Sequence, residues 1–379
     1  MNHPKSPQHL ITAAGLTALA LLSTCMGTAH AAPEQKPQVT HHLKVTYSTP
    51  HHTTRAAAPG KLCSTPVVVT QAFIRTHACK TVQATVTVLK IVNGVPHPQG
   101  TARFTIEHEI GLKLRGTKWS EKISVSKARV TGRASGIRTV LRPTAPGATA
   151  KTTGALAKPF TLGGSAPSGG IDYRMPVAKL KKRTTATTYV FEMTKPGYLP
   201  GRMSYASERY RCDDTLWNES KTRRTAAAGC VFPKHAATDD GTDPSGMAFL
   251  PGIASNIRKV QAAPLHIGRP GSGVPLTRAG EATRKKNRQA VCGGRKPGRG
   301  DVTWVVVPST PGQTYNPTSP SCDEYPFAST HQGGTTYAPP NRAIKWVPRW
   351  ENTLQGQILN SFYTKYRVLV GDPYYVNMG

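Results

Sequence analysis

Residues 61–205 contain a series of short segments that are rich in Val, Ile, Thr and Phe and are separated by Gly and Pro turns. Several of them alternate apolar with polar residues, which is the pattern of a strand with one buried face. Gly and Pro supply 35 + 32 = 67 of the 379 residues, which disfavours a long helical bundle. We therefore predict a mainly β domain over 61–205, antiparallel and sandwich-like, of unknown role. Its expected strands cover 66–70, 81–92, 102–110, 122–130 and 185–193.

Positive charge is spread along the whole chain. There are 49 Lys and Arg residues against 19 Asp and Glu, which gives a formal net charge of +30. Such a chain is expected to bind polyanions, for example nucleic acid, an anionic cell-wall polymer or an anionic membrane surface. Acids are scarce from residue 256 onward, and three of them fall in two short motifs. Acidic residues that stand alone in a basic region could be there to bind a metal ion.

The first 31 residues have the composition of an export signal. Lys5 precedes an apolar run over 10–22, and Ala29, His30 and Ala31 form an A-x-A cleavage site. A membrane-spanning helix needs about 20 apolar residues, and no later segment approaches that length. We predict a secreted protein that is cleaved near Ala31 and makes no stable membrane insertion. Residues 32–60 are predicted to be a linker, with one candidate strand over 43–47.

Six cysteines remain after the signal, namely Cys63, Cys79, Cys212, Cys230, Cys292 and Cys322. An even number of cysteines in an exported chain indicates disulfides. The sequence alone leaves the pairing open, although the grouping along the chain favours Cys63–Cys79, Cys212–Cys230 and Cys292–Cys322. None of the spacings is the short C-x-x-C type of a structural zinc site.

The remaining chain divides into a connector over 206–255, which holds one expected disulfide loop, and a second domain over 256–379. We expect a basic helix over 278–290, a buried strand over 301–307 and a final helix. On that final helix Trp350, Leu354, Ile358 and Phe362 recur every four residues and form an apolar stripe.

The first chemical motif of the second domain is a pair of adjacent acids, Asp323 and Glu324. They follow a cysteine that a disulfide would fix, and Pro326 restricts the backbone behind them. A carboxylate held in this way can take a proton from an attacking water. His331 lies a few residues further on and is the rival candidate for that base, because histidine titrates near neutral pH.

The second motif lies on the final helix. Glu351, Asn352 and Gln355 are spaced to project together, on a different side from the apolar stripe. Oxygen ligands of this kind hold a hard cation and leave positions for water and phosphate. The two motifs together suit a single-metal phosphodiesterase, in which the cation offsets charge on the transition state and the leaving oxygen.

The strings CDEYPFAST and HQGG, followed by ENTLQG and RVLVGDPYYV, resemble the NucA/NucB family of secreted bacterial deoxyribonucleases. The resemblance covers roughly the last 120 residues. It implies a small α+β fold of the ββα-metal nuclease type that uses Mg²⁺ or Mn²⁺. It also implies that an Asp replaces the usual general-base His, which makes Asp323 the base, with Glu324 next in importance and Asn352 near the metal. His331 then either binds the scissile phosphate or has no role beyond its loop.

DNA binding is expected to be mostly electrostatic, through residues that neutralise phosphates without reading sequence. The candidates are Arg284, Lys285, Lys286, Arg288, Arg342, Lys345 and Arg349. Trp346 and Trp350 could stack on bases, but Trp350 also fits the apolar stripe of the helix.

We therefore predict a monomeric, secreted, metal-dependent endodeoxyribonuclease with little sequence specificity. One alternative is a non-catalytic secreted protein that binds a polyanion or the cell wall. Another is a nuclease toxin that the N-terminal domain delivers to a competitor, with a cognate protein inhibitor.

Overall fold

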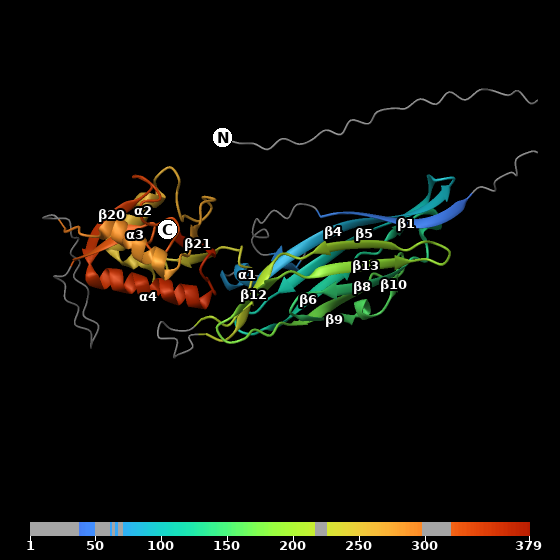
Figure 1. Ribbon diagram of the computed structural model, residues 1–379, viewed down its shortest axis with the longest axis horizontal. Helices are drawn as coiled ribbons and strands as arrows, with labels where there is room; N and C mark the ends of the chain where they lie inside the picture. Colours follow the sequence, from blue (N-terminus) through green and yellow to red (C-terminus); the bar gives the residue numbers. More distant parts are fainter. Residues whose placement is uncertain (1–37, 50–60, 63–64, 67–70, 217–225, 298–319) are drawn as a thin grey trace, which may run out of the picture.

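The computed structural model describes residues 38–49, 61–62, 65–66, 71–216, 226–297 and 320–379. These residues form two regions, each with its own hydrophobic core (Figure 1). The predicted signal peptide, Cys63 and the strand expected over 301–307 lie outside the described residues. No helix in the described ranges combines the length and the apolar character needed to cross a membrane.

The N-terminal region is built on a large sheet in the order β1-β4-β5-β6-β11-β9, with β7 paired to β5. Its neighbouring strands are antiparallel, and β4 pairs with β5 from His77 opposite Gly111 to Val92 opposite Val95. The strands are β1 (Val39–Ser48), β4 (His77–Val92), β5 (Val95–Gly111), β6 (Lys118–Val125), β7 (Arg129–Val130), β9 (Thr149–Gly154) and β11 (Ser168–Arg174). The alternation in the sequence puts every second side chain of β4 and β5 in the core.

A second sheet packs against this one through a shared core, as expected for a sandwich. Its order is β10-β8-β13-β14, and all its pairs are antiparallel. It consists of β8 (Arg138–Thr144), β10 (Phe160–Thr161), β13 (Thr188–Thr194) and β14 (Gly201–Ala206). Short elements complete the region: β2 (Lys61–Leu62), β3 (Thr65–Pro66), α1 (Gln71–Thr76), η1 (Gly132–Ala134) and η2 (Ala155–Ala157). The prediction of a mainly β N-terminal region is confirmed.

The sheet begins earlier than residue 61, inside the segment that we predicted to be a linker. Strand β1 pairs with β4 along its whole length, and Leu43 is buried in the core. The candidate strand expected over 43–47 lies inside β1, and the polar residues around it led us to interpret the rest of the segment as a linker.

The predicted connector is divided between the two regions. Its first part forms β15 (Tyr210–Asp213) and β16 (Gly229–Val231), which pair with each other and, through β15, with β12 (Lys182–Thr185). Cys212 and Cys230 stand directly opposite each other there and form the predicted disulfide. Cys79 is also disulfide-bonded.

The C-terminal region mixes helices with small sheets, which confirms the predicted α+β class. It contains β17 (Ala237–Asp240), η3 (Met247–Phe249), α2 (Pro251–Gln261), β18 (Leu276–Thr277), α3 (Glu281–Cys292), β19 (Pro320–Tyr325), β20 (Ala343–Pro348), α4 (Arg349–Lys365) and β21 (Pro373–Asn377). Strand β21 pairs in parallel with β17 and antiparallel with β18. Because β17, η3 and α2 contribute to this core, the region starts before residue 256.

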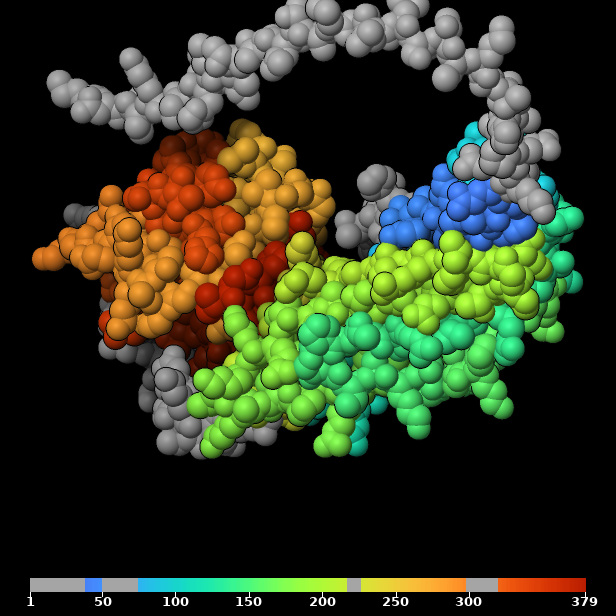
Figure 2. All heavy atoms as spheres, turned by 45° about the vertical axis from the view of Figure 1, so that its right-hand side comes forward, coloured from blue at the N-terminus to red at the C-terminus, as the bar shows by residue number. Residues whose placement is uncertain are grey.

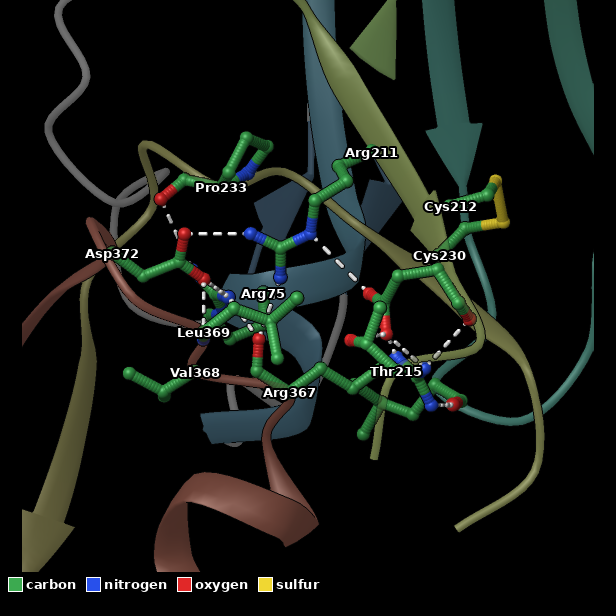
Figure 3. Close-up of polar contacts among 12 residues, drawn as sticks. Arg75, Arg211, Cys212, Thr215, Cys230, Pro233, Arg367, Val368, Leu369 and Asp372 are labelled. Atoms are coloured by element: carbon green, nitrogen blue, oxygen red, sulfur yellow. Dashed lines mark hydrogen bonds and ion pairs between the residues drawn. A yellow bond between two sulfur atoms is a disulfide. The ribbon is translucent and has the colours of Figure 1, made fainter. Parts of the chain in front are cut away.

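A buried cluster of charged residues joins the two regions, and we call it the clasp (Figure 3). It consists of Arg75, Arg211 and Asp213 from the N-terminal region and Arg367 and Asp372 from the C-terminal region. The Asp372 carboxylate accepts hydrogen bonds from Arg75 Nη2 at 2.7 Å and from Arg211 Nη1 at 2.6 Å. Arg367 binds both oxygens of Asp213.

Backbone carbonyls satisfy many of the remaining guanidinium hydrogens. Arg75 donates to the carbonyl of His235 at 2.7 Å and to that of Arg367 at 2.9 Å. Arg75 and Arg367 are 0% and 1% exposed, so solvent does not screen these pairs. Figure 2 shows the same junction from outside, where the C-terminal segment in red lies against the yellow-green strands of the N-terminal region. The clasp therefore fixes the two regions against each other.

Candidate active site

Strands β19 and β20 form an antiparallel hairpin that runs directly into α4, so that the chain follows a β-β-α order. Asp323 pairs with Lys345, and Cys322 pairs with Trp346. Side chains of successive strand residues point to opposite faces. Asp323 therefore faces α2 and α4, whereas Cys322 and Glu324 face α3. The two acids that are adjacent in sequence do not form one carboxylate pair.

Asp323 is 2% exposed and is held by two side-chain amides. Asn256 Nδ2 of α2 donates to Oδ2 at 2.8 Å, and Gln355 Nε2 of α4 donates to Oδ1 at 3.0 Å. Burial raises the pKa of Asp323 to about 7, and the amide hydrogen bonds oppose this effect only in part. The carboxyl group is thus fixed in orientation and titrates near neutral pH.

Glu324 is also buried, at 6% exposure, but on the other face of the hairpin. Arg288 Nη1 of α3 approaches both of its oxygens, at 3.3 and 3.2 Å. Burial raises the pKa of Glu324, and the charge of Arg288 works against that shift. The predicted disulfide between Cys292 and Cys322 is present beside it and ties α3 to β19.

Helix α4 places Glu351 against the start of α2. The side chain is 0% exposed, and Oε2 accepts hydrogen bonds from the backbone N–H groups of Gly252 at 2.8 Å and Ile253 at 3.1 Å. These N–H groups belong to the first turn of α2, where backbone N–H groups have no carbonyl acceptor within the helix. The other oxygen, Oε1, is buried and has no hydrogen-bond partner among the described residues. Burial raises the pKa of Glu351.

Asn352 holds the first half of β19. Its Nδ2 donates to Ser321 Oγ at 2.9 Å and to the carbonyl of Cys322 at 2.8 Å. Both bonds use the amide nitrogen, so neither uses the amide oxygen.

The buried side of α4 differs from the predicted apolar stripe. Glu351 and Gln355 are buried together with Trp350, Leu359 and Phe362, whereas Leu354 and Ile358 are only partly buried. Glu351 and Gln355, which we expected on a different side from the apolar stripe, share the buried side of α4 with part of it. A repeat of four residues drifts around a helix with 3.6 residues per turn, and Gln355, which donates to Asp323, occupies the side of α4 that faces β19.

His331 lies in the exposed loop after β19. Its backbone N–H donates to the carbonyl of Thr277 at 2.9 Å, and its side chain is exposed. In the parts of the chain that the structure describes, its imidazole makes no hydrogen bond to Asp323 or Glu324.

Only three of the predicted DNA-binding residues come together. Arg284, Lys285 and Arg288 line a hollow of about 580 Å³ beside the Cys292–Cys322 disulfide. The others lie elsewhere: Lys286 is exposed on α3, Arg342 and Arg349 flank β20, and Lys345 donates to Ser255 on the Asp323 face. Among the predicted DNA-binding residues, the largest group thus lies at this hollow.

Asp323 and the polar residues of α4 offer the donor types of a hard-cation site, and Gln355 is the residue of this set that hydrogen-bonds to Asp323. Carboxylate oxygens of Asp323 and Glu351 and amide oxygens of Asn352 and Gln355 are the ligand types that Mg²⁺ and Mn²⁺ prefer. The orphaned Oε1 of Glu351 is an oxygen donor that lacks a partner in the protein. A tight cluster of Cys292, Cys322 and Glu324 also exists, but its two sulfurs form a disulfide and are not free to bind a metal.

Asn256 is the site residue that sequence reasoning missed. It is 2% exposed and contacts Asp323, yet it lies in α2, 67 residues before it and in no recognisable motif. One sequence feature could have indicated it: Asn256 lies on the apolar side of an amphipathic helix, between Ile253 and Ile257.

Residues 267–377 match the family model described as Deoxyribonuclease NucA/NucB. The match includes β19, β20 and α4 but not α2 with Asn256. Comparison with curated proteins and with solved structures gave no match for this chain. The DEYPFA string and the helix that follows it lie inside the matched segment. The C-terminal region of this chain therefore contains a domain of the deoxyribonuclease NucA/NucB family.

Proposed function

We propose that the protein is a secreted, metal-dependent endodeoxyribonuclease with Asp323 as its general base. The main support for the proposal is the environment of the Asp323 carboxyl group, which lies within the segment that matches the family model. Strand β19 places its carboxyl group between the amides of Asn256 and Gln355, and burial raises its pKa to about 7. A base with a pKa near the working pH accepts a proton from water most effectively.

Mg²⁺ or Mn²⁺ is the proposed cofactor, held by Glu351, Asn352 and Gln355. When bound, such a cation stabilises negative charge on the phosphate oxygens of the transition state. Asp323 and Glu351 are both buried, and burial raises the pKa of each. Positive charge near the two carboxyl groups favours their ionised forms, which are the forms that bind a metal or accept a proton.

DNA is proposed to bind through its backbone, with little sequence specificity. The basic residues Arg284, Lys285 and Arg288 line one hollow, and counterion release makes contacts of this kind strongly dependent on salt. Secretion is proposed from the signal sequence over 1–31. The disulfides Cys212–Cys230 and Cys292–Cys322 are consistent with an oxidising compartment.

Plasmid cleavage by the full chain tests the proposal. We expect nicking with Mg²⁺ or Mn²⁺ and none with EDTA. Asp323→Asn should lower the rate about 100-fold or more, which is the range of a general base. The matched control is Asp243→Asn, which neutralises an exposed carboxylate of the same region and should leave the rate unchanged.

Two outcomes would decide against parts of this proposal. Absence of cleavage by the wild-type protein with every divalent ion would favour the alternative of a non-catalytic polyanion-binding protein. Loss of activity in His331→Ala with retention in Asp323→Asn would show that His331 is the base.

A further inference from the structure

The hollow beside the hairpin has one aromatic wall. Trp346 of β20 stands opposite Cys322 of β19, so its indole lies on the same face as the Cys292–Cys322 disulfide. Helix α3 supplies the other wall with Arg284, Lys285 and Arg288. A large aromatic ring and three cationic side chains therefore border one space of about 580 Å³.

Trp346 differs from the other tryptophans in the described part of the chain. Trp350 is 9% exposed and belongs to the C-terminal core. Trp119 stacks on Tyr173 with ring centroids 5.1 Å apart. Trp346 is half-buried and is absent from the core cluster of its region. Within the described part of the chain its indole belongs to no core cluster, and its position suits contact with a flat ligand.

The cationic wall suits a phosphate group. Arg284 is paired with Glu281 at 2.7 and 2.6 Å, and Arg288 is paired with Glu324. Lys285 lies 4.0 Å from Glu281, and its side chain is 75% exposed, so its ammonium group is free to turn toward a ligand. Three cations against two carboxylates leave a positive balance at the rim.

We propose that this hollow is a nucleotide subsite, in which one unpaired base stacks on Trp346 while its phosphate is held by Lys285 and Arg284. In a duplex both faces of each base are already stacked on neighbours, so a duplex cannot offer a free base face without local opening. A single strand can, and stacking of this kind tolerates any base. The subsite therefore favours single-stranded DNA, or a frayed or flipped nucleotide, over intact duplex.

This inference rests on the proposed function, because it names the form of DNA that the same domain accepts. Its test is a binding measurement in EDTA, where no cleavage is expected. Fluorescence anisotropy of a labelled single-stranded oligonucleotide is compared with that of the matching duplex. We expect Trp346→Leu to weaken single-strand binding about tenfold and to leave duplex binding nearly unchanged. Trp346→Phe keeps an aromatic face and should retain most of the single-strand affinity.

A second readout is independent of whether the leucine variant folds. Single-stranded DNA should quench part of the tryptophan emission of the wild-type protein, and that part should be missing in Trp346→Phe. Equal losses for single strand and duplex, or no loss in Trp346→Leu, would overturn the subsite. Failure of the plasmid assay would remove the nuclease proposal and leave this binding result intact, so the two failures are distinguishable.

Discussion

The clasp predicts that one neutralising substitution destabilises the whole protein. Asp372→Asn keeps the shape of the side chain but removes the charge that faces Arg75 at 2.7 Å and Arg211 at 2.6 Å. Both guanidinium groups stay buried, and Asp213 becomes the one carboxylate left for three arginines. Removing one partner from a buried ion pair costs ~3–5 kcal/mol. Because backbone carbonyls still accept from Arg75 and Arg211, we expect the lower end, about 3 kcal/mol.

The assay measures the thermal unfolding of the full chain, with its disulfides intact, by calorimetry. At ~2–4 °C per kcal/mol for a folded unit of this size, a loss of 3 kcal/mol lowers the Tm by about 6 °C or more. The control is Glu192→Gln, which removes an exposed pair with Arg142 at a similar distance of 2.7 Å. An exposed pair contributes about 0–1 kcal/mol, so its loss should shift the Tm by at most a few degrees. Equal shifts in the two variants would refute the view that the clasp stabilises the junction.

Three further predictions concern the site. Only ionised Asp323 accepts a proton; burial raises its pKa to about 7 in the metal-free protein, and a bound cation lowers it from there. The cleavage rate should therefore rise with increasing pH below 7 and level off at or below about pH 8; a rate independent of pH between 5 and 9 would exclude this base. Asn256→Ala removes a donor to the ionised carboxylate and should lower kcat about tenfold at neutral pH with little change in KM, as steady-state kinetics would show. Glu351→Ala removes the cap of α2 and should lower the Tm in EDTA by an amount equivalent to ~1–2 kcal/mol, whereas a residue that only binds metal would leave that Tm unchanged.

Local sequence patterns predicted the longest strands and a helix with a strongly basic composition. Strands β4 and β5 follow the expected segments, because their buried residues occur at every second position. Helix α3 begins and ends within a few residues of the expected basic helix. Strands β8, β11 and β14 were missed, and so were the edge strands β9 and β12, whose short runs of Thr, Lys and Arg carry no alternation.

The sequence motifs gave the candidate site residues one by one but not their arrangement. The motif identified Asp323 and Gln355, and the structure brings them into contact at 3.0 Å. Asp323 and Glu324 point to opposite faces because successive residues of a strand do so. This separation could have been predicted from the sequence once the segment was assigned to a strand. The roles of Asn256 and of Arg75 depend on contacts between residues far apart in the chain, such as the separation of 297 residues between Arg75 and Asp372. No local periodicity encodes such contacts.

The clasp also has a consequence for the order in which the chain is made. Ribosomes synthesise Arg75, Arg211 and Asp213 well before Arg367 and Asp372. Until the later pair arrives, the first region holds two arginines against a single carboxylate at a surface that is meant to be covered. Docking of the C-terminal segment brings Asp372 to Arg75 and Arg211, brings Arg367 to Asp213, and covers that surface. We therefore expect a chain interrupted before residue 367 to leave Arg75 and Arg211 without Asp372 and to expose an unsatisfied, charged face to proteases.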